Sequence, residues 1–204
     1  MVELGPATQN EMILAFLRAE IRSSRYGEFI VQNLAPTGFD ERLIDLPNLA
    51  DETENNARER LLCYRGWPNT ALFQGFPRDA TWRRARLEAR DFETMRYIDD
   101  ADSGKHWVEI SDGTRLVTVG ARNLRQRPDD LATQQIAAIA EQIRTGLRFP
   151  ELITVQADNA SLILLEGHSR ATAYVIEQFV DDVEALVASS PLMPAWHFYR
   201  RPRK

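Results

Sequence analysis

The sequence predicts an α+β fold in which a small mixed sheet is packed against helices. Two uninterrupted aliphatic runs, at residues 152–155 and 162–165, are typical of strands that are buried on both faces. Residues 131–143 carry apolar side chains at helical spacing, which indicates an amphipathic helix. Gly167 interrupts the second aliphatic run, and residues 171–176 after it have a helical composition. The chain therefore predicts strand, glycine and helix in direct succession.

Composition excludes several classes of protein. The 204 residues are 44% hydrophobic, which suffices for a core, and the net charge of −5 argues against a general nucleic-acid binder. The single cysteine, Cys63, excludes an intrachain disulfide, and His106, His168 and His197 are too far apart in sequence to indicate a metal site. Because no apolar run approaches the roughly 20 residues that cross a bilayer, and no secretory signal is evident, we expect a cytoplasmic protein without membrane partners.

The first half of the chain alternates helical and extended patterns. Helices are expected at residues 11–24, where four apolar side chains recur at helical spacing, and at 51–64, where acids precede arginines as the helix dipole favours. A short strand is expected at 26–34. Residues 81–90 fit either a strand or a helix, and residues 91–98 fit a helix.

The second half contains the tighter patterns. A strand is expected at residues 114–119, with a polar exit at 121–127. Residues 181–188 fit a helix or a mixture of strand and loop, and residues 196–199 fit a closing strand.

The residues with the richest chemistry are Glu166, Gly167, His168, Ser169 and Arg170. A glycine before a helix start allows close approach of an anion to free backbone N–H groups, and arginine can grip a phosphate with two hydrogen bonds. The histidine can add a hydrogen bond or a positive charge, the serine can cap the helix or touch phosphate, and the glutamate can hold Mg²⁺ or act as a base. The alternative is structural: Glu166 pairs with Arg170, and Ser169 is only an N-cap.

Three arginines after the expected strand at 114–119 are further candidates. Arg122, Arg125 and Arg127 could reach the same phosphates from the strand exit. The competing interpretation is a solvated basic edge.

The order of these parts resembles the ParB/sulfiredoxin superfamily over residues 115–178, about a third of the chain. The resemblance rests on the expected first strand with its exit at 116–127, on Ile143-Arg144-Thr145-Gly146, on Pro150-Glu151-Leu152-Ile153-Thr154-Val155, and on Leu164-Leu165-Glu166-Gly167-His168-Ser169-Arg170. It implies a ParB/sulfiredoxin-like core at residues 106–204, with residues 1–105 as a helical or mixed N-terminal extension packed on it. It also implies that the glycine-containing box binds nucleotide phosphates.

The box distinguishes between members of the superfamily. Sulfiredoxins carry a catalytic cysteine after the glycine, where this chain has His168, so sulfinic acid repair is excluded. Chromosome-partition proteins continue into a DNA-binding domain, whereas only 34 residues follow Arg170. The box is most similar to the acid-Gly-His-His-Arg box of ParB-like proteins, which include free-serine kinases, with Ser169 at the second histidine. Those kinases use a glutamate base in the exit from the first strand, and residues 121–127 contain no carboxylate.

The resemblance implies a nucleotide-binding enzyme that transfers or hydrolyses a phosphoryl group of ATP or CTP with Mg²⁺, acting on a small molecule. In that interpretation Glu166 and His168 are catalytic, and the nucleotide is bound by the set Gly167, His168, Ser169, Arg170, Arg122 and Arg125. The alternatives are a non-catalytic module that senses a nucleotide or anion, and a nuclease or DNA-binding protein, which the acidic charge opposes.

Overall fold

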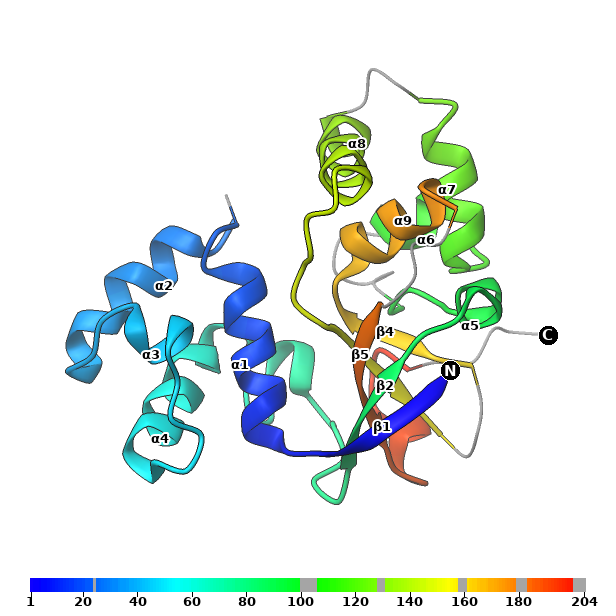
Figure 1. Cartoon of the computed structure of the whole chain (residues 1–204). Helices are drawn as coiled ribbons and strands as arrows, with labels where there is room; N and C mark the ends of the chain where they lie inside the picture. The colour runs from blue at the N-terminus through cyan, green and yellow to red at the C-terminus, as the bar shows by residue number, and fades with distance from the viewer. Residues whose placement is uncertain (24, 100–105, 128–130, 158–160, 179–182, 200–204) are drawn as a thin grey trace.

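A computed structural model describes residues 1–23, 25–99, 106–127, 131–157, 161–178 and 183–199. The fold is α+β, as the sequence predicts: a mixed sheet of five strands lies between two groups of helices (Figure 1). Within the described part of the chain, no helix is long and apolar enough to span a membrane.

The sheet draws its strands from both halves of the chain. Its order is β1-β2-β5-β3-β4, with β1 (Val2–Ala7), β2 (Thr81–Arg86), β5 (Glu184–Ser189), β3 (Leu152–Gln156) and β4 (Ile163–Glu166). Only β3 and β5 run parallel, and the other neighbours are antiparallel. Strands from residues 1–105 and from residues 106–204 therefore share one sheet.

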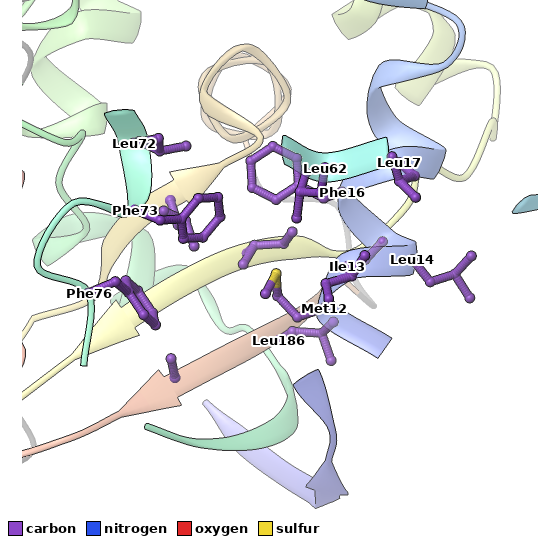
Figure 2. Close-up of a cluster of buried hydrophobic side chains, with 14 of the residues drawn as sticks. Met12, Ile13, Leu14, Phe16, Leu17, Leu62, Leu72, Phe73, Phe76 and Leu186 are labelled. Atoms are coloured by element: carbon purple, nitrogen blue, oxygen red, sulfur yellow. The ribbon is translucent and has the colours of Figure 1, made fainter. Parts of the chain in front are cut away.

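The two faces of the sheet are covered by different helices. Side chains alternate along a strand, so Ile153 and Val155 join one apolar cluster while Leu152 joins the other. The first face is covered by α1 (Gln9–Glu20), α2 (Gly27–Leu34), α3 (Arg42–Asp45) and α4 (Glu52–Leu61), which are drawn in blue and cyan in Figure 1. Figure 2 shows Met12, Ile13 and Phe16 of α1 within this cluster.

The second face is covered by the later helices. These are α5 (Ala89–Thr94), α6 (His106–Ile110), α7 (Val117–Leu124), α8 (Leu131–Arg144) and α9 (His168–Ile176). The predicted helix at 131–143 and the predicted strands at 152–155 and 162–165 are confirmed. The helices expected at 11–24 and 51–64 are also present, the second of them continuing into the 3₁₀ turn η2 (Leu62–Arg65).

Two predicted strands are helices instead. Residues 27–34 form α2, whose buried residues Gly27, Ile30 and Leu34 recur every three to four positions. The strand expected at 114–119 is also wrong, because α7 begins at Val117 and buries Val117, Gly120, Ala121 and Leu124 at helical spacing. The small residues Gly120 and Ala121 conceal this helical stripe in the sequence.

Four further segments had an open, helical or extended prediction, and contacts with distant parts of the chain decide their structure. Residues 81–86 form β2 and residues 184–189 form β5, so the extended alternative holds for both segments. The helix expected at 91–98 ends at Thr94, and Arg96 then pairs with Leu162 and Leu164 through its backbone. The closing strand expected at 196–199 is wrong, since these residues form turns after a 3₁₀ helix.

Candidate functional site

Gly167 forms the junction between β4 and α9. Its φ of 95° is left-handed, and a Cβ there would lie 2.5 Å from Cδ2 of Leu152, so a side chain would strain the backbone and displace Leu152. The first helical bond runs from the N–H of Ala171 to the Gly167 carbonyl at 2.8 Å. The N–H groups of residues 168–170 therefore have no acceptor within the helix, and they lie where the helix dipole is positive. Gly167 is the N-cap residue, so the expectation that Ser169 caps the helix is wrong.

Arg170 is turned back onto the protein. Its Nη1 donates to the carbonyl oxygens of Pro150 and, at 3.1 Å, of Glu151, and its Nη2 lies 3.5 Å from Oε1 of Glu166. Its side chain is only 8% exposed. This arginine thus fixes the start of α9 to the segment before β3, which is the structural pair that the sequence leaves open as an alternative.

His168 lies in an aromatic stack. Its ring centroid is 5.1 Å from that of Trp107 and 6.0 Å from that of Tyr97, and both pairs are near parallel. Burial lowers the pKa of the imidazole to about 3, with a further contribution from the positive charge of Arg65. The ring is therefore neutral near pH 7, so His168 can exchange hydrogen bonds with a ligand but does not supply the positive charge considered from sequence.

A second polar cluster, from the other group of helices, acts electrostatically on this junction. Glu20, the last residue of α1, accepts a hydrogen bond from the Tyr64 hydroxyl, and its carboxylate lies 3.6 Å from Nε of Arg65. Burial, and next the charge of Glu166, raises the pKa of Glu20 to about 7. Arg65 also donates to the hydroxyl of Tyr26 at 2.6 Å.

Sequence reasoning missed this second cluster, although one signal was readable. Glu20 lies seven, four and three residues after Ile13, Phe16 and Leu17, so it occupies the apolar face of its own helix. A buried charge at such a position needs a partner, and the partners come from η2. Because Tyr64 and Arg65 are far from Glu20 in the sequence, no sequence pattern identifies them as its partners.

Three buried nitrogen atoms at this junction have no hydrogen-bond partner among the described residues: Nε2 of His168, Nη2 of Arg170 and Nε of Arg65. Buried polar atoms are nearly always hydrogen-bonded, so such a concentration needs a reason. The His168 Nε2 without a hydrogen bond, the N–H groups of residues 168–170 without acceptors in their helix, and the shifted pKa values of Glu20 and His168 together mark a candidate ligand site.

One of the further candidate arginines, Arg125, lies away from this junction. Arg125 donates to the carbonyl oxygen of Ile176, the last residue of α9, at the opposite end of this helix from Gly167. Arg122 is exposed on α7. The structure therefore brings Glu166, Gly167, His168, Ser169 and Arg170 together and places Arg125 away from them.

A surface groove on the sheet is a weaker candidate. It has a volume of about 530 Å³ and is lined by residues that include Glu3, Thr81, Arg83, Gln156 and Ser189. The guanidinium of Arg83 donates to Ser189 Oγ at 2.7 Å and to Gln156 Oε1 at 2.8 Å, so its charge is already engaged. Two of the buried nitrogen atoms without a hydrogen-bond partner, on His168 and Arg170, lie in the first turn of α9 instead.

No family model, no curated protein and no solved structure matches this chain.

Proposed function

We propose that the start of α9 binds the phosphates of a nucleoside triphosphate, and that the protein is an ATP- or CTP-dependent phosphotransferase or hydrolase of the ParB-like type. The observation that carries the proposal is the Nε2 atom of the nine-tenths buried His168, which has no hydrogen-bond partner among the described residues and lies beside N–H groups that have no acceptor within α9. A helix N-terminus favours an anion through its N–H groups and its dipole, and a neutral imidazole adds one more donor or acceptor.

Mg²⁺ fits the residues at this junction only as a companion of the nucleotide. Protein-bound Mg²⁺ in such sites takes one or two carboxylates together with phosphate oxygens and water. Glu166 is the carboxylate next to the N-terminus of α9, and Glu20 is the second one nearby. Within the described ranges there is no group of three or more His, Cys, Asp or Glu residues that could hold a metal. Bound with the nucleotide, Mg²⁺ would neutralise charge on the transferring phosphoryl group.

The side chains of the box divide their roles in this proposal. Gly167 allows the phosphate to approach the backbone, and His168 exchanges a hydrogen bond with it. Arg170 is a positioning residue, because its donors hold the carbonyl oxygens of Pro150 and Glu151 and so fix the angle at which α9 begins.

The test uses the half-buried Ser169, in the first turn of α9. An acid in the first turn of a helix stabilises it, whereas a negative charge there repels a bound phosphate. Ser169→Asp should therefore weaken binding of ATP and CTP at least about tenfold without loss of thermal stability. Ser169→Asn is the matched control and should bind within about threefold of wild type. Binding is measured by calorimetry with Mg²⁺ present.

Failure to bind either nucleotide would remove the proposal. Equal affinity for Ser169→Asp and Ser169→Asn would place the nucleotide elsewhere on the protein.

A non-catalytic nucleotide or anion sensor is the second candidate. It is favoured by the engagement of Glu166 with Arg170, since that carboxylate already has a charged partner. Turnover separates the two proposals: release of phosphate from bound nucleotide, with or without an acceptor, favours the enzyme, and stable binding without release favours the sensor.

A further inference from the structure

The groove on the sheet lies at the carboxyl ends of the two parallel strands. Gln156 and Ser189 are the last residues of β3 and β5, they are paired in register, and both line the groove. Arg83, on the neighbouring strand β2, reaches both of them with its guanidinium. In open sheets with parallel strands, ligands bind in the crevice outside the carboxyl ends of the strands. The position of the groove therefore fits a small-molecule site.

The guanidinium of Arg83 is fixed by these two neighbours. Its Nη1 donates to Ser189 Oγ at 2.7 Å and its Nη2 donates to Gln156 Oε1 at 2.8 Å, which makes the groove unsuited to a triphosphate. A guanidinium has five N–H groups, so donors remain for a smaller anion, and the side chain is 22% exposed. An arginine already held in place loses little conformational freedom when such an anion binds.

The same two hydrogen bonds turn both neighbours into donors. Gln156 accepts from Arg83 with its amide oxygen, so its Nε2 is left to donate, and this nitrogen makes no hydrogen bond with the described part of the chain. Gln156 is only 3% exposed, and a polar group this buried nearly always has a partner. Ser189 Oγ also accepts from Arg83, and because a guanidinium accepts nothing, the serine O–H must donate elsewhere. Three side chains therefore offer donors around one positive charge.

Charge restricts the anion that this donor set can hold. Of the described residues that line the groove, only Arg83 has a cationic side chain, and Oε2 of Glu3 lies 3.8 Å from its Nε. A phosphate would bring more than one negative charge next to Glu3, whereas a carboxylate brings one and matches the planar guanidinium. Glu3 is 68% exposed, and an exposed ion pair of this kind contributes little, so a ligand carboxylate can displace it.

We propose that the groove binds a small monocarboxylate, whose oxygen atoms accept hydrogen bonds from Arg83, Gln156 and Ser189. The volume of about 530 Å³ leaves room for the rest of the ligand beyond its carboxylate. The site is separate from the proposed phosphate site, because Gly167 contacts Leu152 at the start of β3 and the groove lies at the end of that strand. The inference therefore goes beyond the proposed function and does not depend on it.

The experiment titrates acetate and, separately, inorganic phosphate into the full chain at fixed ionic strength. Nitrogen-15 NMR follows the Nε–H of Arg83 and the side-chain amide of Gln156. Acetate should shift both signals saturably, and phosphate should bind more weakly. Arg83→Gln should weaken acetate binding about tenfold or more, observed at the Gln156 amide, because a charge-assisted hydrogen bond is lost. Arg22→Gln is the control and should bind as wild type does, since Arg22 is 84% exposed and lies 3.9 Å from Asp45.

A second variant removes the competing acid. Glu3→Gln should bind acetate about twofold more tightly or better, because Arg83 then has no charged partner to exchange for the ligand. Glu28→Gln is its matched control, since Glu28 is an exposed acid on α2 that accepts from Gln32. Glu3 is exposed, so this comparison decides the matter even if Arg83→Gln fails to fold.

Three results would overturn the proposal. They are the absence of a saturable acetate shift in wild type, equal acetate affinity of wild type and folded Arg83→Gln, and acetate binding to Glu3→Gln that is no tighter than to Glu28→Gln. Phosphate that binds more tightly than acetate would also contradict a monocarboxylate site. None of these outcomes bears on the nucleotide proposal, whose test uses Ser169 on α9.

Discussion

Tyr64 donates its phenolic hydroxyl to the carboxylate of Glu20, and this hydrogen bond joins η2 to the last residue of α1. The bond lies beside the candidate phosphate site, since the charge of Glu166 acts on both residues. Two carboxylates that approach each other in a region of low dielectric disfavour simultaneous ionisation. The charge of Glu166 therefore favours the protonated form of Glu20.

Stability should depend on pH through Glu20. Its folded pKa of about 7 lies above the ordinary value of 4.5, so the folded state binds the proton more tightly than the unfolded state. This stabilising contribution is complete below pH 4.5 and is lost as the pH rises through 7. The full shift corresponds to a contribution on the order of 3 kcal/mol. Glu20→Gln lacks it, so the melting temperature of the variant minus that of wild type should increase between pH 4.5 and pH 8.

Parallel thermal melts over that pH range test the expectation. The control is Glu59→Gln, because Glu59 is only partly buried on α4 and bonds Gln9 through its side chain. A difference between Glu20→Gln and wild type that does not change with pH would contradict the raised pKa.

Arg170 should stabilise the folded state. Its removal leaves the Pro150 and Glu151 carbonyl oxygens without their donor and Glu166 without its partner. Breaking a buried charged network of this kind costs about 2–4 kcal/mol of the free energy of unfolding. Arg170→Ala should lose that amount in urea unfolding, whereas the exposed Arg122→Ala should change it by less than about 0.5 kcal/mol. Equal stability of the two variants would show that the guanidinium contacts contribute nothing.

A matched pair of substitutions separates the two reasons for glycine at position 167, its backbone conformation and the space next to it. Both Gly167 and Gly146 have left-handed φ values, 95° and 88°, but only Gly167 has a neighbour that a Cβ would strike, namely Leu152. Gly146→Ala should cost about 1–2 kcal/mol of unfolding free energy for its conformation alone. Gly167→Ala should cost at least about 1 kcal/mol more, because the core must also shift. Urea titrations of the two variants measure the difference, and equal losses would mean that Leu152 yields freely.

The sequence predicted the strand-glycine-helix core because its signals are local. Aliphatic runs, a helical stripe at 131–143 and the glycine before α9 each lie within a few residues of one another. The failures have a physical cause as well. In α2 the adjacent Phe29, Ile30 and Val31 favour a strand by composition, yet only Ile30 is buried, since tertiary packing selects one helical face.

The second half of the candidate site was beyond sequence reasoning for a different reason. Glu20 could be recognised as a charge on an apolar helical face, but Tyr64 and Arg65 approach it only because α4 packs back on α1. The sequence identified Arg170 as a residue of the box. It did not predict the hydrogen bonds of Arg170 to Pro150 and Glu151, because these depend on how β3 enters the sheet. Local patterns identified one side of the site, and the fold supplied the other.

His168 offers the most direct test of the site, because the pKa of its ring depends both on burial and on a nearby bound phosphate. Its folded pKa of about 3 lies below the ordinary 6.5, so the unfolded state takes up a proton first as the pH falls. Stability from this group is therefore lost between pH 6.5 and pH 3, and the ring should stay neutral in nitrogen-detected NMR spectra from pH 8 to pH 5.

A bound phosphate supplies a nearby negative charge, which favours the imidazolium form and should raise the pKa of His168 on addition of nucleotide. A His168 ring that titrates near pH 6.5 without ligand would contradict its burial, and one whose pKa is unmoved by saturating nucleotide would place the phosphates away from α9.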